Sequence, residues 1–321
     1  MKVKHMLSMQ DLSSAEIEKV LNISEQLKKE QRAGKPHEVL HGKTLGMVFA
    51  KPSTRTRVSF ETGMTQLGGH ALYLGMNDLQ LGRGETIGDT ARTLSRYVDV
   101  IMARLFSHND IVDLAKHSSV PVINGLTDLH HPCQTLADLM TIRERLGKLK
   151  GVNVAWVGDG NNVCNSMMLG CSLVGANFRA ACPAGYEPPA DTVEQAVENS
   201  KKSGSKIEVF HEPEKAVRGA DVICTDVWVS MGQEKEKEER MKTFEPYQVN
   251  SKLVKMAGPK VIVLHCLPAH RGLEITDEVL DGPHSAVWDQ AENRMHAQKG
   301  LMVLLMGAEK HLRKSNEGCK R

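Results

Sequence analysis

The sequence predicts an α/β protein of two domains, each a parallel sheet flanked by helices. The chain has 321 residues, enough for two domains of ordinary size. Short apolar runs alternate with stretches of helical periodicity along its whole length. Because this alternation is typical of strand–helix–strand units, the strands should pair in parallel with right-handed crossovers. A single sheet of nine strands is the alternative, but two domains fit the length better.

The N-terminal stretch "MKVKHMLSMQDLSSAEIEKV" lacks the apolar core of a signal sequence, and "DLSSAEIEKVL" has the pattern of a capped helix. Val58, Phe60, Met64 and Leu67 then recur at helical spacing. Further helices are expected around 85–97, 108–117 and 133–146. The expected strands are 44–49, 70–74, 99–103 and 120–124.

In the second half, five apolar runs read as strands: 152–158, 177–182, 206–210, 221–226 and 261–265. The stretch "LGKLKGVN", at 146–153, is the expected domain boundary. The charged run "QEKEKEERMK", at 233–242, is expected to be a solvated helix face, and 289–313 has a helical pattern.

The composition excludes several classes of protein. A net charge of +2 and 4% aromatic residues favour neither a nucleic-acid surface nor base stacking. No window approaches the roughly 18 consecutive apolar residues of a membrane span. The seven cysteines are odd in number, scattered and without CxxC spacing, so they indicate neither a disulfide framework nor a zinc site. A reducing cytoplasm is the simplest location.

The stretch "STRTR", at 53–57, follows the strand at 44–49 directly and opens a helix. Ser53 or Thr54 would be its N-cap, next to unpaired backbone N–H groups and the positive end of the helix dipole. Hydroxyls, backbone donors and guanidinium groups together predict a phosphate-like anion site. Arg55 and Arg57 point to nearly opposite sides of a helix, so we expect one of them to face the ligand.

Other strands also end in polar residues, and open parallel sheets bind ligands beyond these carboxyl ends. Arg104 ends one strand, and "DLHHPCQTLAD" carries His131 and Gln134 into a helix. Asp226 ends a third strand, and "HCLPAHRG" follows the last. These loops therefore predict one site to which both sheets contribute.

Three other features of the sequence allow alternative interpretations. "GDGNN" would need glycine at position 163 for a dinucleotide fingerprint, but the residue there is Val163 and no acidic residue follows about 20 positions later. His130 and His131 point in different directions on a helix, which disfavours a metal pair. Cys266 could be a nucleophile or an ordinary buried cysteine, and spacing does not separate the two.

Five motifs together resemble one family. "STRTR", "HPCQTLAD", "DVWVSMGQE", "HCLPAHRG" and "AENR" occur in the order and spacing of the aspartate/ornithine carbamoyltransferases. The combination of "SMG" and "HCLP" is similar to the ornithine-using branch. The resemblance runs from the N-terminal helix to "AENRMHAQKGLM", which is nearly the whole chain.

The resemblance implies roles for individual residues. Those implied for catalysis are Arg104, His131, Asp226 and Cys266. Those implied for binding carbamoyl phosphate are Ser53, Thr54, Arg55, Thr56, Arg57, Gln80, Arg104, His131, Pro132, Cys133, Gln134, Cys266, Leu267 and Arg294. Those implied for binding ornithine are Asn162, Asp226, Ser230 and Met231.

The resemblance also implies an activity and an assembly. A carbamoyl-phosphate domain would span 1–147 and an ornithine domain 148–290, and a C-terminal helix in 291–321 would return to the first domain. The implied reaction is transfer of the carbamoyl group of carbamoyl phosphate to ornithine, in arginine metabolism. It would need no metal or organic cofactor. A homotrimer or a multiple of it is expected, with Gln80 reaching a neighbouring subunit's site. A nicotinamide-dependent oxidoreductase and a non-catalytic anion- or ornithine-binding protein remain as alternatives.

Overall fold

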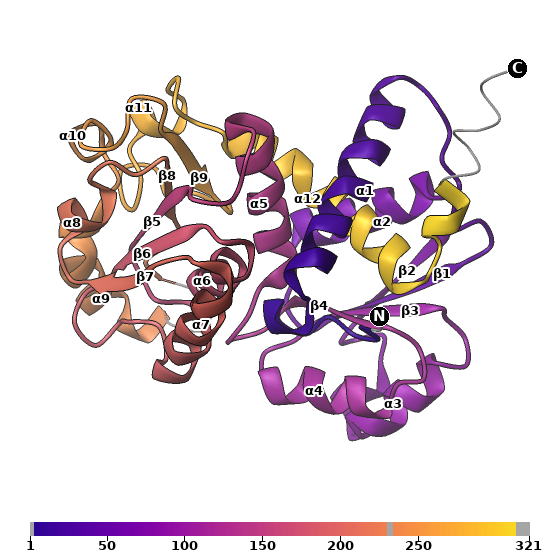
Figure 1. The fold of residues 1–321 in the computed structure, drawn as a ribbon. Helices are drawn as coiled ribbons and strands as arrows, with labels where there is room; N and C mark the ends of the chain where they lie inside the picture. Colours follow the sequence, from indigo (N-terminus) through magenta and orange to yellow (C-terminus); the bar gives the residue numbers. More distant parts are fainter. Residues whose placement is uncertain (1–2, 230–233, 313–321) are drawn as a thin grey trace, which may run out of the picture. The chain divides into compact units, whose positions relative to one another are not determined.

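The structure is a computed structural model that describes residues 3–229 and 234–312. It contains two compact units (Figure 1): one joins the residues up to Ala137 with those from Asn293 onward, and the other is Asp138–Glu292. Each unit has its own parallel sheet, so the prediction of two α/β domains is confirmed and a single nine-stranded sheet is excluded. Compact units are not the same as functional domains, and the predicted domain limits at 147 and 290 stay a prediction.

The first unit is built on a four-stranded sheet in the order β2-β1-β3-β4, with every neighbouring pair parallel. All four strands lie within two residues of the predicted limits. Strands β1 and β3 are nearly all buried, as continuous apolar runs in a covered parallel sheet should be. The strands are β1 (Thr44–Phe49), β2 (His70–Gly75), β3 (Val100–Arg104) and β4 (Val122–Leu126).

Helices cover both faces of this sheet, with α3 and α4 on one side and α1, α2 and α12 on the other (Figure 1). The change of face follows from right-handed crossovers, since the chain moves from β1 to β2 in one direction and returns past β1 to reach β3. The helices of the first unit are α1 (Ser14–Arg32), α2 (Thr54–Gln66), α3 (Ile87–Leu94) and α4 (His108–His117), with short 3-10 turns η1 (Met9–Asp11) and η2 (Gln80–Arg83). Two further helices, α5 (Pro132–Leu146) and α12 (Val287–Leu305), have residues in both units.

The second unit has a five-stranded parallel sheet in the order β7-β6-β5-β8-β9. The five predicted strands of this half are all present. They are β5 (Asn153–Val157), β6 (Asn177–Ala181), β7 (Ile207–Phe210), β8 (Val222–Thr225) and β9 (Ile262–His265). The remaining elements are α6 (Asn162–Val174), α7 (Ala190–Ser203), α8 (Pro213–Val217), η3 (Glu234–Glu236), α9 (Lys237–Phe244), η4 (Glu245–Tyr247), α10 (Ser251–Val254) and α11 (Asp277–Leu280).

The charged run 233–242 departs from its prediction at one residue. Its other charged side chains whose burial the structure describes are exposed, but Arg240 is only 2% exposed. The guanidinium of Arg240 pairs with the carboxylate of Asp159 and lies 4.8 and 5.0 Å from the ring centres of Tyr186 and Phe244. A planar guanidinium can stack on aromatic rings while its charge is paired, which lets an arginine in a charged run turn inward.

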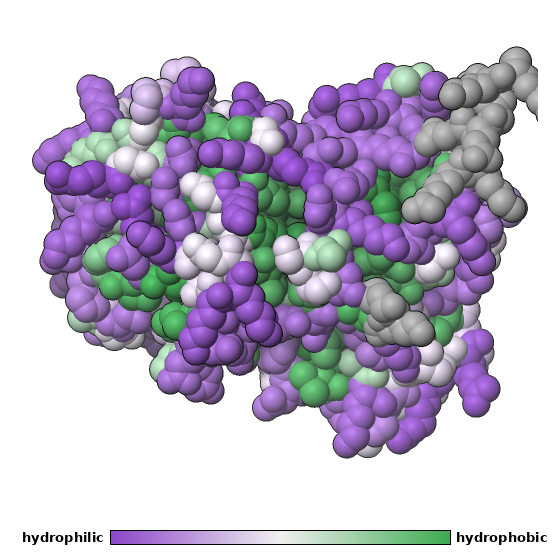
Figure 2. Space-filling view, in the orientation of Figure 1, coloured by the Kyte–Doolittle hydropathy of each residue, from purple (hydrophilic) through white to green (hydrophobic). Residues whose placement is uncertain are grey.

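The face of the molecule drawn in Figure 2 is largely polar. Figure 2 shows hydrophilic residues over much of the visible face, with smaller hydrophobic areas between them. Within the described residues, none of the helices combines the length and apolar character needed to cross a membrane.

Shortening a buried side chain on the central strand of the second sheet should destabilise the second unit. Val154, on β5, is fully buried, whereas Val197, on α7, is 40% exposed. We expect Val154→Ala to lower the free energy of unfolding of the second unit by about 2 kcal/mol, because it removes buried methyl groups and leaves a cavity. Val197→Ala is the matched control and should change it by less than about 0.5 kcal/mol.

Urea unfolding followed by tryptophan fluorescence measures this difference. All three tryptophans, at 156, 228 and 288, belong to the second unit, so the signal reports on that unit. Equal unfolding midpoints for the two variants would contradict the assignment of Val154 to the core.

Candidate active site

The strand order of each sheet points to where a ligand binds. In the first sheet the chain leaves β1 toward β2 and returns to β3, so the order reverses between β1 and β3. In the second sheet the order reverses between β5 and β8. Parallel sheets bind ligands outside the carboxyl ends of the strands at such reversals. The residues after β1 and β5, and those that end β3 and β8, are therefore the first candidates.

The N-terminus of α2 lies at the first reversal. Ser53 is its N-cap, and the Ser53 Oγ accepts a hydrogen bond of 3.2 Å from the backbone N–H of Thr56. Strand register places Phe49, the last residue of β1, beside Arg104, the last residue of β3. The helix N-terminus and the Arg104 backbone therefore lie at the same edge of the sheet, where an anion would meet backbone donors and a positive dipole.

The two arginines of "STRTR" differ in environment. Arg57 is exposed, stacks 4.0 Å from the ring centre of Tyr73 and pairs with Glu61 at 3.3 Å. Arg55 is half-buried, and its charge lies close enough to His131 to affect the pKa of that ring. The structure thus brings Arg55 toward the candidate anion site and directs the Arg57 side chain to Tyr73 on β2.

His131 is surrounded by positive charge. The side chain is 4% exposed, and burial is the largest cause that lowers its pKa well below the usual value. The guanidinium groups of Arg294, Arg104 and Arg55, in decreasing order of effect, lower this pKa further. His131 is therefore a neutral imidazole at pH 7, and three guanidinium groups in one buried region favour the binding of an anion.

Arg294 links three helices by side-chain hydrogen bonds. From α12, its guanidinium donates to Gln134 Oε1 on α5 at 2.7 Å and to Thr56 Oγ1 on α2 at 3.3 Å. The hydroxyl of Thr56 also accepts from Ser53 Oγ at 3.1 Å. Thr56, Gln134 and Arg294 are all at most 3% exposed. The predicted residues Ser53, Thr56, Gln134 and Arg294 thus form one connected polar group.

The other predicted residues of the first unit have different environments. Pro132 and Cys133 are buried at the start of α5, where the Cys133 thiol donates to the carbonyl of Asn124 at 3.3 Å. Burial raises the pKa of Cys133 to about 12, so this thiol stays protonated and is no nucleophile. Thr54 and Gln80 are exposed, at the starts of α2 and η2.

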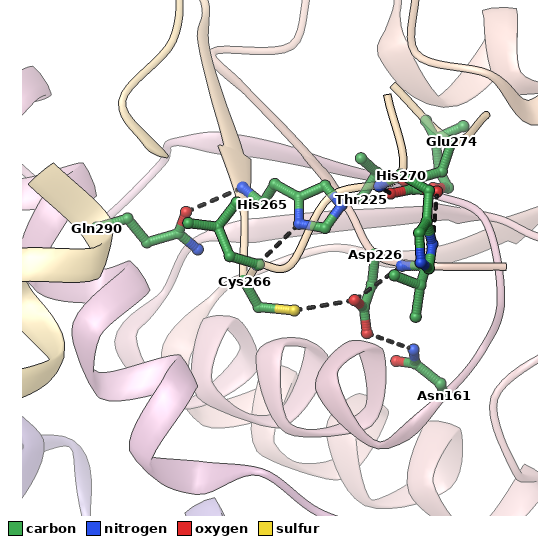
Figure 3. Close-up of polar contacts among 11 residues, drawn as sticks. Asn161, Thr225, Asp226, His265, Cys266, His270, Glu274 and Gln290 are labelled. Carbon is green, nitrogen blue, oxygen red and sulfur yellow. Dashed lines mark hydrogen bonds and ion pairs between the residues drawn. The ribbon is translucent and has the colours of Figure 1, made fainter. Parts of the chain in front are cut away.

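In the second unit, Asp226 follows β8 and accepts several hydrogen bonds (Figure 3). Its Oδ2 accepts from Asn161 Nδ2 at 2.7 Å, and its Oδ1 accepts from the Cys266 thiol at 2.9 Å. The backbone N–H of Val227 also donates to Oδ1, at 2.8 Å. These donors fix the direction of the carboxylate, which is only 7% exposed as a residue.

A buried histidine shapes the "HCLP" segment. The Nδ1 atom of His265 accepts from the backbone N–H of Leu267 at 2.9 Å, so Nε2 carries the proton and donates to Glu274 Oε1 at 3.0 Å. Both side chains are fully buried. Among the described residues, Leu267 is the one non-glycine residue with a positive φ, at 60°. This hydrogen bond from Leu267 helps to hold a backbone conformation that costs free energy.

Asp226, His265 and Cys266 also place three possible metal-ligand atoms within 4.8 Å of one another. The hydrogen bonds argue against a resident metal ion there. Both ring nitrogens of His265 are engaged, and the Cys266 thiol uses its proton to bind Asp226. A metal ion would have to displace each of these bonds, so this donor set does not fit one.

The predicted ornithine residues are described only in part. Ser230 and Met231 lie outside the described residues. Asn162 is the half-buried first residue of α6, and its neighbour Asn161 is the N-cap that contacts Asp226. The sequence prediction missed Asn161, although an asparagine directly before a helical pattern is an N-cap signal that could have indicated it. It also missed Glu274, for which the sequence offers no signal.

Two family models match successive parts of the chain. Residues 4–144 match the family model for the carbamoyl-phosphate-binding domain of aspartate/ornithine carbamoyltransferases, and residues 150–305 match the model for their aspartate/ornithine-binding domain.

Two similar proteins and one similar solved structure carry the name ornithine carbamoyltransferase. The chain is 58% identical to an ornithine carbamoyltransferase of Pyrococcus abyssi over 97% of this chain and 98% of that protein. It is 58% identical to an anabolic ornithine carbamoyltransferase of Pyrococcus furiosus, covering 96% of this chain and 98% of that one. The structure of ornithine carbamoyltransferase from Pyrococcus furiosus superposes with a TM-score of 0.93, covering 95% of this chain and 98% of that chain. The chain therefore belongs to the aspartate/ornithine carbamoyltransferase family.

Proposed function

We propose that the protein transfers the carbamoyl group of carbamoyl phosphate to the side-chain amine of L-ornithine, giving L-citrulline and phosphate. The observation that carries this proposal is the group of three guanidiniums, from Arg55, Arg104 and Arg294, around the neutral His131. This arrangement suits a substrate that has a phosphate dianion next to a polar carbonyl group. The name shared by the similar full-length proteins supports ornithine as the acceptor.

The proposed division of labour follows the two family models. A first domain, 1–147, binds carbamoyl phosphate, and a second, 148–290, binds ornithine, which the matches over 4–144 and 150–305 support. The C-terminal part, 291–321, returns to the first domain. The inclusion of the residues from Asn293 onward in the first compact unit supports this last assignment.

Carbamoyl phosphate is held by its two charged or polar ends. The phosphate binds the hydroxyls of Ser53 and Thr54, the backbone at the start of α2, and the Arg55 side chain. The carbonyl oxygen accepts hydrogen bonds from Arg104 and His131. The Gln134 amide lies near the carbamoyl group and is held there by its hydrogen bond from Arg294. His131 can donate one N–H while neutral, so no protonation is needed to polarise the carbonyl.

The chemistry is an addition followed by an elimination. The ornithine amine, whose pKa is about 10.4 in a lysine-like group, loses its proton before it attacks the carbamoyl carbon. The new C–N bond leaves a tetrahedral oxyanion, which donors such as Arg104 stabilise by about 3–4 kcal/mol each. The C–O bond to phosphate then breaks, and Arg55 and the α2 N-terminus stabilise the departing charge. The first proton of the ammonium group goes to solvent, and the second, released from nitrogen once the C–N bond has formed, passes to the leaving phosphate. No enzyme-bound covalent intermediate forms.

Asp226 is the proposed partner of the α-ammonium group of ornithine. Its carboxylate is oriented by Asn161 and by the Cys266 thiol, so Cys266 acts as a donor in this proposal. Asn162, Ser230 and Met231 complete the proposed ornithine contacts. Holding both substrates in register contributes about 7–11 kcal/mol to the reduction of the barrier.

The proposed setting is anabolic. The word "anabolic" in the name of the Pyrococcus furiosus relative supports a role in arginine biosynthesis. The six cysteines that the structure describes are free thiols, which supports a reducing compartment such as the cytoplasm. We further propose a homotrimer or a multiple of it, in which the exposed Gln80 reaches the site of a neighbouring subunit.

A citrulline assay on two adjacent arginine variants tests the phosphate site. Arg55→Leu should lower kcat/KM for carbamoyl phosphate roughly tenfold to a hundredfold, because it removes a charge-assisted hydrogen bond worth about 1.5–3 kcal/mol. Arg57→Leu is the matched control, since its side chain stacks on Tyr73, and should stay within about threefold of wild type. Equal losses in both variants would show that the phosphate lies elsewhere.

Acceptor choice tests the second half of the proposal. L-ornithine should exceed putrescine, N-acetylornithine, lysine and aspartate by at least about tenfold in kcat/KM, or about 1.4 kcal/mol. Putrescine lacks the α-carboxylate, N-acetylornithine lacks a free α-ammonium for Asp226, and lysine places its amine one methylene too far. Initial rates with the five amines decide the matter, and a preference for putrescine or aspartate would remove the ornithine assignment but keep carbamoyl transfer.

Subunit mixing tests the assembly. Gln80→Ala and Arg104→Ala should each be inactive alone, because each damages every site. After subunit exchange, activity should return in part, since a hybrid trimer can contain a site with both native residues. Mass spectrometry can verify that hybrid trimers form, and verified hybrids without activity would rule out a shared site.

A further inference from the structure

Lys299, on α12, is fully buried, although lysine is among the residues least often found inside proteins. An ammonium group has three N–H donors. The structure supplies an acceptor for each, from three different segments of the first unit. The Nζ atom lies 2.9 Å from Gln31 Oε1, 2.8 Å from Gln66 Oε1 and 3.2 Å from His37 Nε2.

The histidine contact has a defined direction. The Nδ1 atom of His37 lies 3.2 Å from the carbonyl oxygen of Lys35, and only an N–H can donate to that oxygen. Burial lowers the pKa of His37, which keeps the ring neutral with its single proton on Nδ1. Nε2 is therefore an acceptor, and Lys299 is the donor in all three hydrogen bonds.

The helices approach each other closely around Lys299. A Cβ atom on Gly63 of α2 would lie 3.2 Å from Lys299 Cγ, and one on Gly300 of α12 would lie 2.1 Å from Ser24 Oγ on α1. A second buried lysine adds a contact on the same side, because Lys28 Nζ on α1 donates to Asn293 Oδ1 at 2.6 Å. Asn293 is the residue directly before Arg294.

Helix α12 is thus bonded to α2 near both ends of α2. Arg294 donates to Thr56 in the first turn, and Lys299 donates to Gln66, the last residue. A slip of one residue along a helix moves every side chain by about 1.5 Å, whereas hydrogen bonds tolerate a few tenths of an ångström. Fixing the register at Lys299 therefore also fixes the height at which the Arg294 guanidinium meets Thr56 and Gln134.

We propose that Lys299 is a positioning residue for Arg294: its three hydrogen bonds hold α12 in the register that delivers the Arg294 guanidinium to the carbamoyl-phosphate site. This inference rests on the function proposed above. It assigns to a fully buried lysine, outside the reacting groups, a role in binding one of the two substrates.

The positioning of Arg294 by Lys299 should depend on pH, because it requires the charged form of Lys299. Burial lowers the pKa of Lys299 to about 8, and the charge of Glu30 acts in the opposite direction. An uncharged amine has two N–H donors, so it cannot serve the three acceptors. The register contact is complete below about pH 8 and is lost as the pH rises through that value. The other titratable groups in this cluster are Lys28, Glu30 and Arg32 from α1, His37 from the segment before β1, and His296 from α12.

The histidines of this cluster do not titrate in the same range. Burial lowers the pKa of His296 to about 3, and the pKa of His37 is also lowered. Both rings are therefore neutral throughout the range from pH 7 to pH 9.5.

The test compares Lys299→Met with wild type, because methionine has a similar length and no donor. Lys19→Met is the matched control: Lys19 pairs with Glu309 and so also joins α1 to the segment after α12, but its side chain is 48% exposed. We expect Lys299→Met to raise KM for carbamoyl phosphate about tenfold at pH 7, with a smaller change in KM for ornithine. Lys19→Met should leave both within twofold.

The pH profile separates positioning from stability alone. The ratio of wild-type to Lys299→Met kcat/KM for carbamoyl phosphate should be largest at pH 7 and approach one above pH 9, since the wild type then lacks the ammonium too. A ratio near one at every pH, with only a lower melting temperature for the variant, would overturn the proposal. Gln66→Leu removes one acceptor and serves as the second variant if Lys299→Met fails to fold.

The affinity for inorganic phosphate tests the role of Lys299 without any enzymatic turnover. The dissociation constant, measured by calorimetry, should be weakened by Lys299→Met and by Gln66→Leu at pH 7 and unchanged by Lys19→Met. Absence of citrulline formation by the wild type would refute the proposed function. Equal phosphate affinity in all variants would refute the role of Lys299, whichever result the citrulline assay gives.

Discussion

The hydrogen bonds of Arg294 to Gln134 and Thr56 are the contacts on which the first cluster depends. They join residues that lie 160 and 238 positions apart in the chain. Without them the N-terminus of α2 and the start of α5 would still be separate anion-favouring ends of helices. With them, a guanidinium from α12 lies beside His131 and lowers its pKa. One long-range contact thus converts two local features into a polar group of defined geometry.

The second unit has an acidic side chain at a strand end. Here a carboxylate, Asp226, takes the place of the guanidinium groups, and its direction is set by Asn161 and Cys266. The "HCLP" segment is in turn tied down by the fully buried pair of His265 and Glu274. The two units therefore offer opposite charges, a cluster of guanidinium groups in the first and an oriented carboxylate in the second.

Both units contain buried charged side chains with specific partners. Arg240 pairs with Asp159 and stacks on aromatic rings, and Lys299 donates to three neutral acceptors. Burying a charge costs free energy, and removing one of its partners costs more, because the remaining group is left uncompensated. Such groups tolerate few alternative arrangements, so they specify the positions of helices and loops more narrowly than apolar packing does.

The sequence by itself determined the nine strands, the parallel α/β class, a helix cap at Ser53 or Thr54 and the family motifs. These features follow from local periodicity and capping, which depend on residues near one another in the chain. Tertiary structure alone decided that Arg55, and not Arg57, lies near His131, that Arg240 turns inward, and that Glu274 and Lys299 are buried with specific partners. The physical reason is that burial and hydrogen bonding between distant segments depend on how helices pack, and no periodicity in the sequence records which residue a side chain will meet.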